Sequence, residues 1–268
     1  MKFKIHFGFK EEPFSKELPK KKLLEFPYMK GVYERIDYAL NIGAGMVLTG
    51  DVGSGKSSAL RWSLSHFHPS QVKVINILAT KGTLTELYKQ MSWALGIVIK
   101  GSGNATHIKN IKATIEEIYR SKKQKVLFVI DEAQLLKTEV FEEIHLLSQY
   151  KNDSMNMMGL VLSGQPLLID KLSVRASMSL ASRIVGRAHI SGLNREQMDE
   201  YVSHHLAQSG ITKGLFNESA ITAIHQGSGG ILRKANNLAR GGLIAAANEG
   251  VNEVTPKHIR MAATELII

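Results

Sequence analysis

The stretch MVLTGDVGSGKSSALRW, residues 46–62, places glycines, a lysine and serines directly after an apolar run. It contains the pattern G-x-x-x-x-G-K-[ST], in which glycines let successive backbone N–H groups turn toward one anion. The amino end of the helix that follows adds partial positive charge. We therefore predict a strand, a phosphate-binding loop and a helix that together hold a nucleoside triphosphate. The residues expected to contact this cofactor are Gly50, Asp51, Val52, Gly53, Ser54, Gly55, Lys56, Ser57 and Ser58.

Two residues of this loop have specific expected roles. Lys56 reaches the β and γ phosphates, and the Ser57 hydroxyl is a ligand for Mg²⁺. The cofactors implied by the pattern are therefore ATP and Mg²⁺.

A second motif, KVLFVIDEAQ at residues 125–134, consists of an apolar run that ends in two acids. Val126 to Ile130 predict a buried strand with Asp131 and Glu132 at its tip. A carboxylate beside a phosphate loop can hold the Mg²⁺ water shell, which suits Asp131. The adjacent Glu132 can polarise an attacking water as general base. This pair favours hydrolysis over phosphoryl transfer to a small metabolite.

The segment GLVLSGQPLL, residues 159–168, predicts another strand with Ser163 and Gln165 at its tip. A polar residue at this position can contact the γ-phosphate or the attacking water. Ordinary capping of the strand end is the alternative, and the sequence does not choose between the two residues.

Apolar segments and helical patterns alternate between Gly45 and Leu193 and predict five strands, the last of them in RAHISGL at residues 187–193. Near-continuous apolar strands separated by helices indicate a parallel sheet covered on both faces. From Asn194 onward, short helical patterns punctuated by glycine predict a small helical domain. The expected organisation is an N-terminal arm at 1–30, an α/β domain at 31–193 and a helical lid at 194–268.

Composition narrows the compartment and the partners. The chain lacks cysteine, which excludes disulfides and thiolate metal sites, and it has no apolar run of the roughly 20 residues that cross a bilayer. We therefore expect a cytoplasmic protein without a membrane partner. The net charge of +10 favours polyanionic partners, nucleic acid first and an anionic membrane surface second, with a merely solvated basic surface as the alternative.

The motif order resembles the AAA+ ATPases and, within them, the ExeA-like group, over essentially the whole chain. Two departures occur in the lid motif GGILRKANNLA, where Leu232 replaces a proline and Ala235 an isoleucine. The resemblance implies an AAA+ P-loop NTPase fold, with a five-stranded parallel sheet and a helical lid. The residues that carry it are Phe7, Gly8, Pro13, Phe14, Gly164, Gln165, Pro166 and the segment LASRIVGRAHISGL at 180–193.

The same resemblance implies roles for arginines. Arg183 would act as an arginine finger on the nucleotide of a neighbouring subunit, with Arg187 as the rival for that role. Arg233 would be the lid's sensor arginine on the chain's own nucleotide. A surface salt bridge is the alternative in each case.

The ExeA-like group has two branches with different partners. One contains TnsC/TniB/MuB-like helpers of DNA transposition, which assemble with ATP on duplex DNA and recruit or activate a transposase. The other contains ExeA/GspA-type cytoplasmic ATPases of secretion or envelope-assembly complexes. The basic charge and the end of the sequence after the lid favour the first branch. Its expected partners are double-stranded DNA, further copies of the chain in a ring or filament, and a transposase; a replication-type DNA loader is a weaker option.

Contacts to DNA are expected from basic residues that meet phosphates without reading base sequence. The basic run Lys20–Lys22 in the arm is a candidate contact for a neighbouring subunit or a transposase. The expected DNA-binding residues follow the second strand and the next glycine-rich segment: Thr80, Lys81, Lys100, Lys109 and Lys112.

Overall fold

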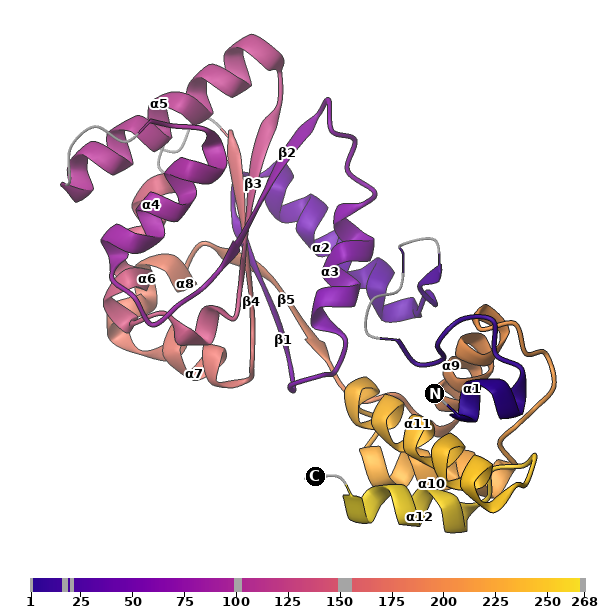
Figure 1. Cartoon of the computed structure of the whole chain (residues 1–268). Helices are drawn as coiled ribbons and strands as arrows, with labels where there is room; N and C mark the ends of the chain where they lie inside the picture. Colours follow the sequence, from indigo (N-terminus) through magenta and orange to yellow (C-terminus); the bar gives the residue numbers. More distant parts are fainter. Residues whose placement is uncertain (1, 16–18, 20–21, 99–102, 149–155, 266–268) are drawn as a thin grey trace. The chain divides into compact units, whose positions relative to one another are not determined.

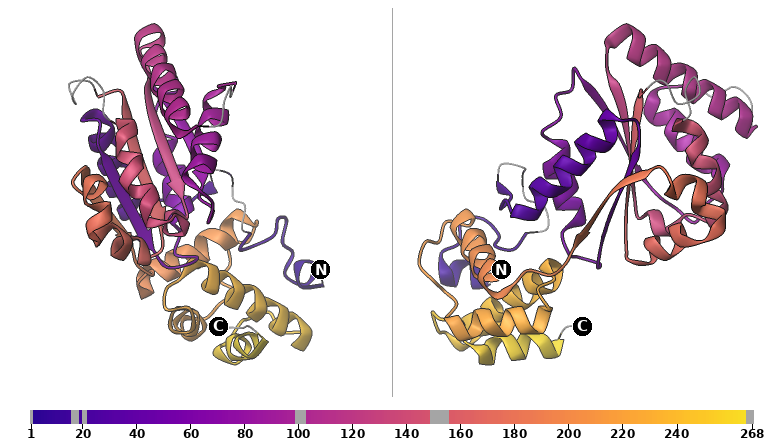
Figure 2. Two further views of the ribbon diagram at one scale, coloured as in Figure 1. Left: turned by 90° about the vertical axis from the view of Figure 1, so that its left-hand side faces the viewer. Right: turned by 180° about the vertical axis from the view of Figure 1, so that it is seen from behind.

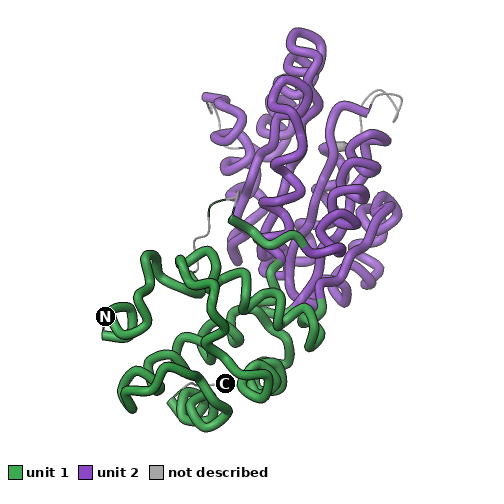
Figure 3. Tube along the Cα trace, turned by 90° about the vertical axis from the view of Figure 1, so that its right-hand side faces the viewer, with its two compact units in different colours: residues 1–25, 51–55, 191–268 green, residues 26–50, 56–190 purple. Residues whose placement is uncertain are grey.

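The computed structural model describes residues 2–15, 19, 22–98, 103–148 and 156–265. These residues form two compact units, shown in purple and green in Figure 3. The purple α/β unit comprises Phe26–Gly50 and Lys56–Ile190, and the green helical unit comprises Met1–Glu25, Asp51–Gly55 and Ser191–Ile268. Of the expected contact residues, Lys20, Lys21 and Lys100 lie outside the described ranges.

Five parallel strands form the sheet of the α/β unit, in the order β2-β3-β4-β1-β5 (Figure 1). This confirms the predicted parallel α/β fold. Strands β1 and β4 are buried along their whole length, as expected for apolar strands covered on both faces. The bounds are β1 Gly45–Gly50, β2 Val72–Leu78, β3 Lys125–Asp131, β4 Met158–Gly164 and β5 Ile184–Ile190.

Helices cover both faces of this sheet. In Figure 1, α2 and α3 lie on one face and α4 to α8 on the other, and the view from behind in Figure 2 shows the same division. Thr83 starts α4 with a capping box to Glu86, and Gly96 ends it in the left-handed conformation. The helices are α2 Pro27–Asn41, α3 Lys56–Leu64, α4 Leu84–Leu95, α5 Asn104–Lys122, α6 Thr138–Ile144, α7 Leu167–Ser173 and α8 Met178–Ala181, with short 3₁₀ turns η2 Ala133–Leu135, η3 His145–Ser148 and η4 Arg175–Ser177.

The edge strand β5 differs from its expected position. The sequence RAHISGL suggested a strand from Arg187, whereas β5 begins at Ile184, which pairs with Gly45 of β1. Burial alternates along β5, with Val185, Arg187 and His189 exposed. Because β5 has a neighbour on one side only, it lacks the continuous apolar run that marks the interior strands.

Among its described residues, the helical unit contains four helices that follow the sheet and one short helix at the amino end. Asn194 accepts the Gln197 backbone N–H in a capping box, and Asn217 accepts the Ala220 backbone N–H, so a side-chain cap starts α9 and α10. Among the helices in the described ranges, none is both long and apolar enough to span a bilayer. The bounds are α1 Lys2–Phe7, α9 Arg195–Gln208, α10 Glu218–Ser228, α11 Leu232–Glu249 and α12 Pro256–Glu265.

The amino-terminal segment packs against this helical unit. Phe14 is 1% exposed, stacks on the His205 ring at 5.1 Å and meets the Phe216 ring edge-on at 6.1 Å. Its carbonyl oxygen accepts a hydrogen bond from Arg240 Nη2 at 2.7 Å. Burial, with a smaller contribution from the charge of His204, lowers the pKa of His205 to about 4. The first residues are therefore part of the core of the helical unit.

The basic run expected to contact a neighbour is partly engaged within the chain. Lys22 donates to Glu11 at 2.6 Å, and its carbonyl oxygen is hydrogen-bonded by His204 Nε2 at 2.8 Å. Sequence patterns did not indicate this attachment, because it depends on contacts between residues far apart in the chain.

Candidate active site

The loop between β1 and α3 has the backbone conformation that a phosphate site needs. Gly53 and Gly55 have φ angles of 85° and 105°, a region that residues with a side chain rarely adopt. Ser54 is 2% exposed, and its hydroxyl has no hydrogen-bond partner within the described residues. A buried hydroxyl without a partner fits a loop built to bind a polar ligand, and the chemistry of the loop fits the phosphates of ATP.

The first residues of α3 follow this loop at the carboxyl end of β1. Lys56 is 6% exposed, and its ammonium donates to the Gly50 carbonyl oxygen at 2.8 Å. Ser57 is exposed, and its hydroxyl lies 3.4 Å from Asp131 Oδ2. Ser58 follows as a partly buried residue. The two predicted Mg²⁺ ligands, Ser57 and Asp131, thus come together although 74 residues separate them.

Asp131 is held by a second pair of contacts. Its Oδ1 accepts a hydrogen bond from the Ser163 hydroxyl at 2.7 Å and from the Glu132 backbone N–H at 3.0 Å. Ser163 is fully buried at the end of β4, next to β3 in the sheet. A hydroxyl and a carboxylate are hard oxygen donors of the kind Mg²⁺ prefers, so this pair fits the metal.

Glu132 follows directly and turns the chain out of β3. Its φ and ψ are 55° and 33°, a left-handed conformation uncommon for a residue with a side chain. Its carboxylate Oε2 accepts a hydrogen bond from Gln134 Nε2 at 2.6 Å. The sequence pattern indicated no role for Gln134, and its place two residues after Glu132 in the DEAQ segment was the available signal.

The second polar residue at the tip of β4, Gln165, has a partly buried side chain. Its backbone N–H donates to Gln134 Oε1 at 3.0 Å. Ser163 and Gln165 therefore contact different partners: the hydroxyl engages Asp131, and the backbone of Gln165 engages Gln134.

Arg233 is the second residue of α11 and lies beside the phosphate loop. Its backbone N–H donates to the Gly53 carbonyl oxygen at 3.1 Å, and a Cβ built on Gly53 would lie 2.5 Å from the Arg233 Cβ. The Arg233 side chain is exposed. The loop segment at 51–55 and the predicted lid arginine are thus in direct contact.

Arg183 and Arg187 lie on or next to β5. The Arg183 carbonyl oxygen accepts a hydrogen bond from Gly45 N at 2.9 Å, at the amino end of β1, whereas the loop begins after Gly50 at the other end. Five strand steps of about 3.3 Å separate these ends by about 17 Å, farther than an arginine side chain extends. Arg187 pairs with Val47 in the middle of the strand and is exposed. Arg183 therefore cannot reach the start of its own chain's phosphate loop.

Four of the expected DNA-contact residues lie within the described ranges, two in the segment after β2 and two on α5. Thr80 and Lys81 are exposed just before α4, and Lys109 is exposed on α5. A hydrogen bond of 2.7 Å from Thr85 to Asn104 joins the first turns of α4 and α5. Lys112 lies one turn beyond Lys109 and is partly buried.

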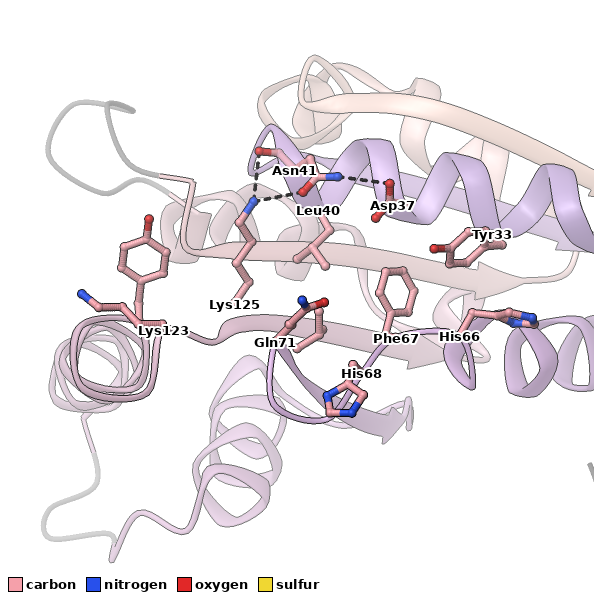
Figure 4. A pocket seen from close by; sticks show the side chains of 12 residues that line it. Tyr33, Asp37, Leu40, Asn41, His66, Phe67, His68, Gln71, Lys123 and Lys125 are labelled. Atoms are coloured by element: carbon pink, nitrogen blue, oxygen red, sulfur yellow. Dashed lines mark hydrogen bonds between the residues drawn. The ribbon is translucent and has the colours of Figure 1, made fainter.

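A hollow of about 380 Å³ lies at the amino end of the sheet, away from this chemistry (Figure 4). It is lined by side chains from α2, the loop after α3 and the end of α5, among them Tyr33, Phe67, His68 and Lys123. Lys125 on its wall donates to Asn41 Oδ1 at 3.2 Å, and Asn41 donates to Asp37 at 3.1 Å. The carboxyl ends of the strands, where the phosphate loop and the acids lie, are at the opposite edge.

Comparison with known proteins finds similarity over the part of the chain that contains these residues. Residues 43–172 match the family model described as an AAA domain. General secretion pathway protein A of Aeromonas hydrophila is 31% identical over 263 residues, which cover 97% of this chain and 48% of that protein. The chain thus spans about half the length of this curated relative.

Solved structures share the fold. Cdc6p of Pyrobaculum aerophilum has a TM-score of 0.70 at 16% identity, covering 95% of this chain and 70% of that chain. The ORC2 protein of Aeropyrum pernix has a TM-score of 0.71 at 16% identity, and the match covers 96% of this chain and 72% of that chain. The RuvB motor of Thermotoga maritima has a TM-score of 0.54 at 14% identity, and the match covers 91% of this chain and 70% of that chain. Residues 43–172 therefore match the AAA domain family, and the chain shares the α/β fold of these solved structures.

Proposed function

We propose that the chain hydrolyses ATP with the residues gathered at the carboxyl ends of β1, β3 and β4. The loop N–H groups and Lys56 hold the phosphates, and Arg233, whose backbone N–H contacts Gly53, is proposed as the lid's sensor arginine. Ser57 and Asp131 would hold Mg²⁺, which when bound neutralises charge on the phosphate oxygens. Glu132 accepts a proton from the attacking water as it adds to the γ-phosphorus, and ADP leaves. The contact between Ser57 and Asp131 is the observation that carries this assignment.

Ser163 and Gln165 have separate proposed roles in this site. Ser163 fixes the Asp131 carboxylate by its 2.7 Å hydrogen bond. Gln165, at the tip of the same strand, is the residue proposed to contact the γ-phosphate or the attacking water.

We propose further that hydrolysis requires a second copy of the chain. Arg183 lies at the edge of the sheet opposite its own phosphate loop, so it can serve an active site only in trans. A cation supplied by the neighbour stabilises charge in the phosphoryl-transfer transition state and makes turnover depend on assembly. Arg187, exposed on the same strand, is the alternative donor.

We propose that the assembled form binds duplex DNA and acts in the cytoplasm. In this proposal, ATP-bound copies form a ring or filament on DNA, recruit or activate a transposase, and disassemble when ATP is hydrolysed. The net charge of +10 supports a polyanionic partner. The observation that supports it is the hydrogen bond from Thr85 to Asn104, which joins α4, the helix after the exposed Lys81, to α5, the helix that carries the exposed Lys109.

The test is electron microscopy and DNA retention with and without a non-hydrolysable ATP analogue. Nucleotide-dependent rings or filaments on DNA are expected, and Lys56→Ala should not form them. Lys81→Ala should weaken binding and reduce the slope of log K against log salt by about one. Lys213→Ala, which removes an exposed lysine of the helical unit, is the matched control.

A second candidate function follows from the 31% identical General secretion pathway protein A. In this alternative the chain is the ATPase part of a secretion or envelope-assembly complex, and its partners are proteins at a membrane. DNA that remains bare in every nucleotide state, together with normal ATP turnover, would favour this function over the first.

A further inference from the structure

The side chain of Gln134 connects the tips of two strands. It lies in η2 and is 5% exposed. Its Nε2 donates to Glu132 Oε2 at 2.6 Å, and its Oε1 accepts from the Gln165 backbone N–H at 3.0 Å. One amide therefore joins the carboxylate that follows β3 to the backbone that follows β4.

The position of this amide is restricted from two directions. A Cβ on Gly164 would lie 2.4 Å from Gln134 Oε1, so the glycine provides the space that the amide occupies. Lys171 of α7 donates to the carbonyl oxygens of Gln134 and Leu136 at 2.6 and 2.7 Å, which holds the η2 backbone. Because both the side chain and the backbone are held, Gln134 can orient the group it contacts.

The group that Gln134 contacts is the Glu132 carboxylate. Within the described part of the chain, no second side chain hydrogen-bonds to the Glu132 carboxylate. A hydrogen bond at Oε2 fixes the rotamer and leaves Oε1 available to a water molecule. A general base must lie within hydrogen-bond distance of the proton that it accepts, so its orientation controls the rate.

We propose that Gln134 is a positioning residue for ATP hydrolysis, which orients the Glu132 carboxylate and couples that orientation to the tip of β4. The inference rests on the proposed role of Glu132 as general base. Through this amide, a displacement of the Gln165 backbone reaches Glu132 by a single side chain.

The test separates the donor from the acceptor of the amide. Gln134→Glu keeps an oxygen for the Gln165 N–H but removes the donor to Glu132 and places a second carboxylate beside it. We expect kcat to fall 10- to 100-fold, because small displacements of a catalytic group cost up to about 100-fold. KM for ATP and the affinity for a non-hydrolysable analogue should stay within about twofold. Gln226→Glu, an exposed glutamine of α10, is the matched control.

A double-mutant cycle with Glu132→Gln distinguishes positioning from general structural damage. If Gln134 acts through Glu132, Gln134→Glu should cause no further loss of kcat in the Glu132→Gln background, because residues that act as a unit are non-additive. A full additive loss would overturn the inference, as would wild-type kcat in Gln134→Glu alone. Wild-type kcat in Glu132→Gln would instead refute the base assignment, and the inference with it.

A second variant at Gln134 covers the case in which Gln134→Glu impairs nucleotide binding. Should Gln134→Glu lose affinity for the analogue, Gln134→Met replaces it in the same cycle, since it preserves length while removing both polar ends. The same non-additivity with Glu132→Gln is expected, and additive loss again overturns the inference.

Discussion

Substitution of Gly53 tests whether the phosphate loop binds ATP in the conformation seen in the structure, because two independent constraints require a glycine at this position. Its φ is 85°, and a Cβ would lie 2.5 Å from the Arg233 Cβ at the start of α11. Gly53→Ala therefore strains the backbone and also forces the loop and α11 apart. Both effects oppose the loop conformation proposed to bind phosphate.

The magnitude follows from the backbone penalty. A left-handed conformation costs a residue with a side chain roughly 1–2 kcal/mol. A loop that escapes this strain must recover the same conformation to bind ATP, so affinity should fall by about 5- to 30-fold, at about 1.4 kcal/mol per tenfold. The collision with Arg233 adds to this cost, and the expected loss is at least about tenfold.

The assay is titration with a fluorescent ATP analogue in the presence of Mg²⁺. Gly214→Ala is the control, because a Cβ at Gly214 meets no heavy atom within 4 Å and its φ is outside the left-handed region. Repeating Gly53→Ala in an Arg233→Gly background removes the collision and leaves the backbone cost. The loss of affinity should then be smaller than in the parent chain.

Wild-type affinity in Gly53→Ala would refute the reasoning, since it would mean that the loop binds ATP in another conformation. An equal loss in both backgrounds would refute the steric part and leave only the backbone strain.

Three further predictions concern assembly, pH and the amino-terminal segment. Arg183→Ala and Glu132→Gln should each have strongly reduced ATPase activity, but mixing them should restore part of it, because one copy supplies the intact loop and base and the other the arginine; no recovery in the mixture would contradict a trans arginine. The pKa of His205 lies below its usual 6.5, at about 4, so its contribution to stability is complete above pH 6.5 and is lost as the pH falls toward 4. At 1.36 kcal/mol per unit this amounts to roughly 3 kcal/mol, and urea unfolding of His205→Gln should show a correspondingly flatter dependence between pH 6.5 and 4 than the parent chain. Phe14→Ala should lower the free energy of unfolding by about 3–5 kcal/mol, because it removes a buried aromatic ring; a loss below about 1 kcal/mol in the same urea assay would show that the segment is not part of the core.

Short sequence patterns predicted the strands of the parallel sheet and the phosphate loop, because each of these elements is formed by residues that are adjacent in the sequence. Apolar runs such as 126–130 become interior strands, and parallel strands bring their carboxyl ends to one edge. Ser57, Asp131 and Ser163 could therefore be expected to meet. The start of β5 was misplaced, because an edge strand with exposed alternate residues lacks that apolar signal.

The sequence by itself predicted an α/β sheet with a nucleoside triphosphate site at the ends of its strands, because loop, acids and strands are encoded in short contiguous segments. Tertiary structure alone decided three further features: the Gln134 amide between Glu132 and Gln165, the position of Arg183 at the far edge of the sheet, and the packing of Phe14 on His205. Each depends on side-chain packing or strand register between distant segments. No local pattern specifies such contacts, since the same residues could satisfy their hydrogen bonds and burial with other partners.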